Sequence, residues 1–63
     1  MIEKEVHLLL VEDDHALRDV TAEQLKEHGF RVVQAKSGEE ALDHLATFAF
    51  DVIVTDLRLP GID

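Results

Sequence analysis

The stretch Asp51-Val52-Ile53-Val54-Thr55-Asp56 decides the fold of this chain. It is a short apolar run, rich in β-branched residues, that ends in a carboxylate and is soon followed by Pro60-Gly61. β-Branched residues favour strands, and the run is too short for a helix. The pattern therefore predicts a buried β-strand over residues 51–55, with Asp56 at its carboxyl end.

A second apolar run, His7-Leu8-Leu9-Leu10-Val11, also leads into acids, Glu12-Asp13-Asp14. It lacks the polar alternation of a half-exposed strand, which is typical of a strand covered on both faces within a parallel sheet. If the two runs are parallel neighbours, their terminal carboxylates meet at one edge of the sheet. This convergence is the main functional hypothesis.

The segment between Asp14 and Gly29 has the features of a helix. Asp14 is a suitable N-cap, and Gly29 supplies a left-handed stop, with Phe30 as the apolar residue that follows such a stop. The spacing predicts a helix from about His15 to His28. The residues expected on its apolar face are Leu17, Val20, Thr21 and Leu25.

The next segment predicts a strand and a second helix. Arg31–Ala35 is short and more polar, as expected of an edge strand. Ser37 and Glu40 form a capping box, which opens a helix to about Phe48. Its expected apolar face consists of Ala41, Leu42, Leu45 and Ala46. The resulting β-α-β-α-β order predicts an α/β fold with a parallel sheet and right-handed crossovers.

Composition limits the possible partners. The 63 residues include 14 acids and 6 bases, for a formal charge of −8, and no cysteine. Such a charge disfavours contact with nucleic acid or with anionic membrane surfaces, and it suits a cation or a basic partner. No signal peptide and no membrane-spanning run is visible, so the cytoplasm is the expected compartment.

The acids at the two strand ends suggest a chemistry. Gathered carboxylates repel one another unless a cation lies between them, and Mg²⁺ favours such oxygen ligands. A carboxylate beside the metal could also act as a nucleophile toward a phosphoryl group. The alternative is that these acids are ordinary loop residues and that Asp14 only caps a helix. Ligands of doubly wound sheets bind beyond the carboxyl ends of strands, which favours the metal site.

These motifs, in this order and spacing, resemble the response-regulator receiver domain of two-component signalling. The matching residues are Leu8-Leu9-Leu10-Val11-Glu12-Asp13-Asp14, Leu17-Arg18, Gly29-Phe30, Val32, Ala35, Ser37-Gly38-Glu39-Glu40-Ala41-Leu42 and Asp51 through Gly61. The resemblance implies a flavodoxin-like doubly wound sheet, of which this chain supplies the first three strands in the order 2-1-3.

The resemblance also implies roles for individual residues. Asp56 is then the phosphoacceptor, modified by a sensor histidine kinase. Asp13 and Asp56 are direct Mg²⁺ ligands, together with the backbone carbonyl of Arg58, whereas Glu12 acts through water. On this basis the chain is a signalling domain and not an enzyme.

The matched portion is about half of a typical receiver domain. Residues 1–63 are therefore expected to be a truncated receiver domain, without the hydroxyl residue and lysine that the family places on later strands. An apolar third strand without its next neighbour is an exposed edge, and exposed edges recruit other strands. We expect self-association through this strand.

Two alternatives remain open. One is an inert half-fold fragment that self-assembles and transfers no phosphoryl group. The other is a metal-dependent phosphohydrolase with an aspartate nucleophile, which commonly has an acid two residues after the nucleophile, where this chain has Arg58. No glycine-rich nucleotide loop occurs, and the four histidines are not spaced for a zinc site on one helix.

Overall fold

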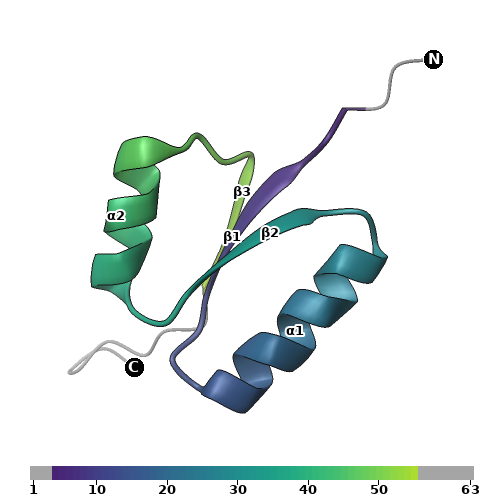
Figure 1. Ribbon diagram of the computed structural model, residues 1–63, viewed down its shortest axis with the longest axis horizontal. Coiled ribbons are helices and arrows are strands. Elements are labelled where there is room, and N and C mark those ends of the chain that lie inside the picture. The colour runs from purple at the N-terminus through teal and green to yellow at the C-terminus, as the bar shows by residue number, and fades with distance from the viewer. Residues whose placement is uncertain (1–3, 56–63) are drawn as a thin grey trace.

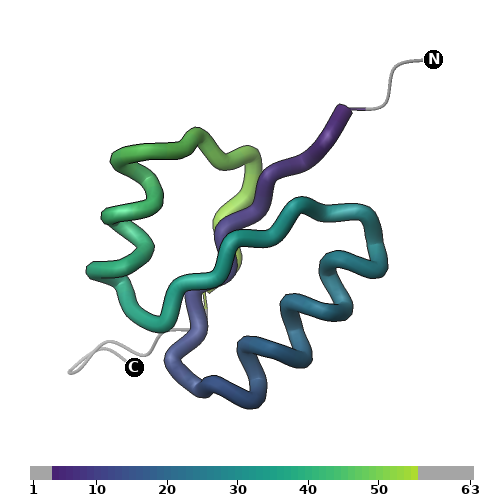
Figure 2. The backbone as a smooth tube through the Cα atoms, in the orientation of Figure 1, coloured from purple at the N-terminus to yellow at the C-terminus, as the bar shows by residue number. Residues whose placement is uncertain are grey.

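A computed structural model describes residues 4–55. The elements in chain order are β1 (His7–Val11), α1 (His15–Glu27), β2 (Arg31–Ala35), α2 (Gly38–Thr47) and β3 (Val52–Thr55). The predicted β-α-β-α-β order is therefore confirmed, with element ends within one residue or so of the expected ones. Figure 1 shows the three strands running together between the two helices, and Figure 2 traces the same path as a tube.

The three strands form one parallel sheet in the order β2-β1-β3. Leu9 of β1 lies opposite Val33 of β2 on one side and Ile53 of β3 on the other. β1 is thus the central strand, as its unbroken apolar sequence indicated. The order 2-1-3 confirms the expected first half of a doubly wound sheet.

β1 carries a small core on each of its faces. Alternate residues of a strand point to opposite faces, so Leu8 and Leu10 pack with Ala22 of α1, whereas Leu9 and Val11 pack with Ala41 of α2. Leu8 and Leu9 are the largest fully buried side chains, at 1% and 0% exposure. The helices therefore lie on opposite faces of the sheet, which requires the two crossovers to pass on opposite sides.

The ends of α1 are built as the sequence predicted. The Asp14 side chain accepts a hydrogen bond from the Leu17 amide at 2.9 Å, which caps the first turn. At the other end Gly29 has a φ of +93°, the Gly29 amide donates to Lys26 O, and the Phe30 amide donates to Leu25 O. This pair of bonds satisfies the carbonyls of Lys26 and Leu25 in the last turn and leads the chain into β2.

The start of α2 differs slightly from the ideal capping box. The Ser37 hydroxyl accepts from the Glu40 amide at 3.1 Å, as expected. The Glu40 carboxylate, however, accepts from the Lys36 amide rather than from that of Ser37 itself. The two contacts still fix the turn that joins β2 to α2, because the Ser37 hydroxyl binds an amide in the first turn of the helix and the Glu40 carboxylate binds an amide ahead of it.

The predicted helix faces are partly wrong. Leu17 and Val20 are 46% and 55% exposed, while Thr21 and Leu25 are half-buried around the fully buried Ala22. In α2 the expected Ala41 is buried, but Leu42, Leu45 and Ala46 are exposed. Both helices pack mainly over β1 and β2, so the apolar residues that turn away from these strands find no cover among residues 4–55.

β3 is also less buried than its sequence predicted. Val52, Ile53 and Val54 are between 36% and 51% exposed, and Thr55 is exposed. The reason is positional: β3 pairs with β1 only, and neither helix packs against it within the described part of the chain. An apolar β-branched run indicates a strand correctly, but it cannot tell whether its neighbours are present.

Candidate functional site at the carboxyl ends of the strands

The predicted site lies where β1 and β3 end side by side. Their last paired residues are Val11 and Thr55, which lie opposite each other in the parallel ladder. Glu12 follows Val11 directly. Asp56 follows Thr55 in sequence but, like Arg58, it lies outside the described residues. The strand adjacency that the hypothesis required is therefore present.

Glu12 is the best-fixed acid of this region. It is only 6% exposed, its amide donates to Ala35 O of β2, and its carboxylate accepts from the Asp14 amide at 3.0 Å. A buried carboxylate normally has such partners, because an unpaired one is costly. These contacts hold Glu12 at the strand end and leave Asp13, the next residue, exposed.

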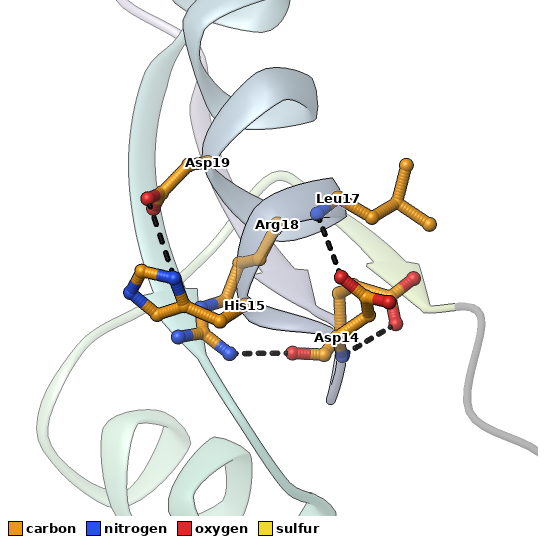
Figure 3. Close-up of polar contacts among 6 residues, drawn as sticks. Asp14, His15, Leu17, Arg18 and Asp19 are labelled. Atoms are coloured by element: carbon orange, nitrogen blue, oxygen red, sulfur yellow. Dashed lines mark hydrogen bonds and ion pairs between the residues drawn. The ribbon is translucent and has the colours of Figure 1, made fainter.

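Arg18 also contacts the end of β1, and the sequence did not predict this contact. Its guanidinium donates to the backbone carbonyl of Glu12 at 2.9 Å, reaching back from α1 to the end of β1 (Figure 3). In the sequence analysis, Arg18 was quoted only among the residues that resemble the family and was given no contact, whereas its side chain is half-buried. The available signal was its position one turn beyond the Asp14 cap, which brings a helix residue back over the strand end.

The Asp14 side chain caps α1, and Figure 3 shows its hydrogen bond with the Leu17 amide. Farther along α1, His15 and Asp19 form an exposed i, i+4 contact of 3.7 Å. No three acids or histidines among residues 4–55 gather into a metal-binding group. Of the three acids expected at the Mg²⁺ site, the structure describes the adjacent pair Glu12 and Asp13. The third, Asp56, lies outside the described residues.

The opposite end of the β1–β3 pair carries a second acid, Asp51. Its carboxylate accepts from the His7 amide at 2.9 Å, and its own amide donates to His7 O at 2.8 Å. Lys4 lies 3.4 Å from the other carboxylate oxygen. The His7 hydrogen bond and, secondarily, the Lys4 charge hold the pKa of Asp51 below its ordinary value of 3.8. The sequence analysis treated Asp51 only as the first residue of the strand.

The family model described as "Response regulator receiver domain" matches residues 8–63. The chain belongs to this family. The resemblance inferred from the motifs is therefore confirmed over nearly the whole sequence. Receiver domains are signalling modules that exchange phosphoryl groups with sensor histidine kinases and generally bind Mg²⁺ for this purpose.

Curated relatives agree with the receiver assignment. The chain is 48% identical over 56 residues, or 89% of its length, to the transcriptional regulatory protein AfsQ1 of Streptomyces coelicolor. It is 34% identical over 58 residues, or 92% of its length, to the CAI-1 autoinducer sensor kinase/phosphatase CqsS of Vibrio cholerae. These matches cover 25% and 8% of the two relatives, so the matched segment is a small part of both.

A solved receiver structure has the same fold. The chemotaxis response regulator CheY4 of Vibrio cholerae superposes with a TM-score of 0.83 at 30% identity. The superposition covers 94% of this chain and 49% of that one. The chain thus spans about half of the matched receiver. Within residues 4–55, neither helix has the length and apolar content needed to cross a lipid bilayer.

Proposed function

We propose that this chain is the phosphoacceptor half of a receiver domain, and that Asp56 takes the phosphoryl group from a sensor histidine kinase. The single observation that carries the proposal is the β1–β3 register. It pairs Val11 with Thr55, and the next residues along the two strands are Glu12 and Asp56. Parallel strands that end together bring the residues that follow them to one edge of the sheet.

The acids of this edge suit Mg²⁺ by their chemistry. Asp13 is exposed and offers hard carboxylate oxygens, whereas Glu12 is buried and held by the Asp14 amide. We assign Asp13, Asp56 and the backbone carbonyl of Arg58 as the direct ligands, with Glu12 acting through water. Mg²⁺ commonly uses one or two carboxylates and keeps several waters. When bound, the ion would offset the charge on the transferring phosphoryl oxygens.

The proposed reaction transfers one phosphoryl group from a kinase histidine to Asp56. A carboxylate oxygen of Asp56 forms a bond to phosphorus as the bond from phosphorus to the kinase imidazole nitrogen breaks. That nitrogen keeps the electron pair, and the product is an acyl phosphate on Asp56. The chain accepts a group and does not turn over a substrate, so we classify it as a signalling domain. We expect it to act in the cytoplasm.

Phosphate incorporation tests this function. The chain is incubated with Mg²⁺ and a small-molecule phosphodonor, and intact-mass spectrometry measures the gain of one phosphoryl group. The expected result is a gain that Asp56→Asn abolishes and that removal of Mg²⁺ suppresses. Asp43→Asn is the matched control, because Asp43 is an exposed acid on α2, away from the strand ends.

Equal labelling of the Asp56→Asn variant would overturn the assignment of the phosphoacceptor. Absence of labelling in the unmodified chain would instead support an inert half-fold. Adding the second half of a receiver domain to the chain and repeating the assay separates a missing contact from a wrong residue. Recovery of labelling on Asp56 would support the site, and continued inactivity would contradict it.

Self-assembly is the second candidate function. All eight large hydrophobic residues that are exposed within residues 4–55 belong to α1, α2, the residue after α2, or β3. They lie on both sides of the sheet: the pairing of β3 with β1 puts Val52 and Val54 on the α1 side and Ile53 on the α2 side. A strand edge flanked by apolar surface on both faces favours pairing with a second chain.

Light scattering coupled to size exclusion tests this candidate. We expect a dimer or larger assembly whose mass falls on dilution and with Ile53→Lys. Gln24→Lys is the matched control, because it adds the same charge to an exposed position of α1. A folded monomer at all concentrations would contradict self-assembly without affecting the phosphoacceptor assignment.

A further inference from the structure

The turn Glu12-Asp13-Asp14, which joins β1 to α1, is held on both sides of Asp13. On one side, the Glu12 amide donates to Ala35 O at 3.0 Å, and the Glu12 carboxylate accepts from the Asp14 amide at 3.0 Å. On the other side, the Asp14 carboxylate accepts from the Leu17 amide at 2.9 Å. Asp13 is exposed, and within residues 4–55 its carboxylate makes no hydrogen bond or ion pair. A held turn therefore presents a carboxylate that has no partner in this part of the chain.

A further contact to this turn comes from the side chain of Arg18 on α1. Its Nη1 donates to Glu12 O at 2.9 Å in a partly buried contact, which Figure 3 shows. This carbonyl belongs to the peptide bond that leads into Asp13. Because a peptide bond is planar, fixing its carbonyl also fixes the orientation of the next amide and thus of the backbone that carries the Asp13 side chain. The Arg18 amide donates to Asp14 O at 2.8 Å, so the arginine is itself anchored at the turn.

Arg18 does not act as the counter-charge of the acids beside it. Three consecutive acids precede α1, yet none of the ion pairs within residues 4–55 includes Arg18. An arginine close to acids commonly binds a carboxylate, often through two parallel hydrogen bonds. Here the guanidinium binds a neutral carbonyl instead. The contact therefore orients the turn and leaves the Asp13 carboxylate available to another cation.

We infer that Arg18 is a positioning residue for the proposed Mg²⁺ site: by holding the Glu12 carbonyl, it fixes the direction in which the backbone presents Asp13. This inference rests on the proposed role of Asp13 as a metal ligand. Mg²⁺ demands a near-ideal octahedral arrangement of oxygens, so a ligand that is already oriented binds it better than a mobile one. Groups that hold metal ligands in place typically change metal affinity by about 10- to 100-fold when they are removed.

The positioning role and the charge of Arg18 affect cation binding in opposite directions. The guanidinium is a positive charge at the turn, and like charges repel, so its charge weakens the binding of a cation nearby. If only this charge mattered, removing Arg18 would strengthen metal binding. If Arg18 positions Asp13, removing it should weaken metal binding even though the repulsion is lost. The direction of the change therefore decides between the two roles.

Titration with Mn²⁺, which suits the same oxygen ligands as Mg²⁺, measures this effect in a set of variants. Arg18→Met removes the hydrogen bond and the charge but keeps an apolar stem, whereas Arg18→Lys keeps the charge and one shorter donor. Lys26→Met is the matched control, because it removes the same charge from the last turn of α1. Asp13→Asn removes the proposed ligand. NMR line broadening at residues 12 and 13 gives the Mn²⁺ concentration of half-effect, normalised to the folded fraction from circular dichroism.

Arg18→Met should raise the Mn²⁺ concentration of half-effect about 10-fold. The Asp14 amide, which donates to the Glu12 carboxylate, should also exchange faster with solvent when the turn is released. Arg18→Lys should lie between the unmodified chain and Arg18→Met. Lys26→Met should change the concentration by less than roughly twofold, because its exposed charge is at the far end of the helix and is screened. A purely structural role of Arg18 would lower the folded fraction and leave the affinity of the folded chain unchanged.

Unchanged or tighter Mn²⁺ binding by folded Arg18→Met would overturn the inference. Weaker binding by Arg18→Lys than by Arg18→Met would also overturn it, because charge would then govern the affinity. If Arg18→Met does not fold, Arg18→Gln takes its place, since its amide ends two bonds short of the arginine Nη1 that reaches Glu12 O. The proposed metal site fails separately if Asp13→Asn binds Mn²⁺ as tightly as the unmodified chain. Exchange of the Asp14 amide then still shows whether Arg18 holds the turn.

Discussion

The two neighbours of β1 are held in different ways. On the β2 side, helices lie over both faces, Ala35 is fully buried, and the turns before and after β2 are closed by capping contacts. On the β3 side, no residue of the strand is buried, and the ladder is secured at its start by Asp51. The same central strand thus has one neighbour with a buried residue of its own, and another whose residues are all exposed and whose contact with the core comes from Phe50, ahead of the strand.

The part of the chain that is expected to determine global stability is therefore different from the strand that leads to the proposed phosphoacceptor. The β1-α1-β2-α2 part contains every buried residue among residues 4–55, whereas the residue proposed to accept the phosphoryl group follows the less firmly held strand. Regions of low local stability open most readily and are common at functional sites. We therefore expect changes on the β2 side to alter global unfolding, and changes on the β3 side to alter local opening and the site.

The largest expected effect on stability comes from Leu9, which lies opposite Val33 on one side and Ile53 on the other. Leu9→Ala should lower the free energy of unfolding by about 2–5 kcal/mol, as for other fully buried leucines. Ile53→Ala should cost roughly 1 kcal/mol, because about half of its side chain is already in contact with solvent. Urea denaturation followed by circular dichroism measures both. Equal losses would show that β3 is as well packed as β1.

Gly29 tests the link between α1 and β2. Its φ of +93° is strained for any residue with a Cβ, although no atom lies within 4 Å of that position. Gly29→Ala should therefore destabilise the chain by about 1–2 kcal/mol through backbone strain alone. Gly38→Ala, in the first turn of α2, is the control and should be neutral or slightly stabilising. A neutral Gly29→Ala would contradict the role of the left-handed stop.

Amide hydrogen exchange sharpens the comparison without any substitution. The amides of β3 that bond to β1 should exchange faster than the amides of β2 that bond to β1, because β3 can open without disturbing the core. NMR-detected exchange measures each amide separately. Identical protection on both sides would mean that the three strands open only together, and the proposed division would be lost.

The smallest expected effect is a pH dependence confined to β3. The pKa of Asp51 is lowered in the folded chain from 3.8, chiefly by the His7 hydrogen bond and also by Lys4. Its stabilising contribution is therefore complete above pH 3.8 and is lost as the pH falls through the lower folded value. Acid titration followed by NMR should show the Ile53 contacts weakening before those of Val33. Asp51→Asn should abolish this order.

The sequence predicted the elements well because their signals are local. Asp14, Gly29 and Ser37 each contact backbone within a few residues, so their roles could be inferred from spacing alone. The central position of β1 followed from its unbroken apolar run. The parallel order 2-1-3 came from the family resemblance, and the structure confirms it.

The sequence-based predictions that were wrong or missing concern the burial and contacts of side chains, and not the positions of helices and strands. Leu17, Val20 and Leu42 are apolar at helical spacing, yet they are exposed because cover for them would have to come from outside residues 4–55. Arg18 and Asp51 were missed because their partners are backbone groups of Glu12 and His7, and backbone partners have no sequence signature. Glu12 and Asp13 follow the end of β1 as expected, while their role at a metal ion, and the roles of Asp56 and Arg58, remain predictions.

The most direct test of the account is whether Glu12, Asp13 and Asp56 share one cation. Mn²⁺, which suits the same oxygen ligands as Mg²⁺, broadens the NMR signals of nearby nuclei and can be titrated into the chain. We predict that the amides of residues 12, 13 and 56 broaden together at the lowest metal concentration, and that excess Mg²⁺ reverses the effect. Broadening spread evenly over surface acids such as Asp19 and Asp43 would contradict it.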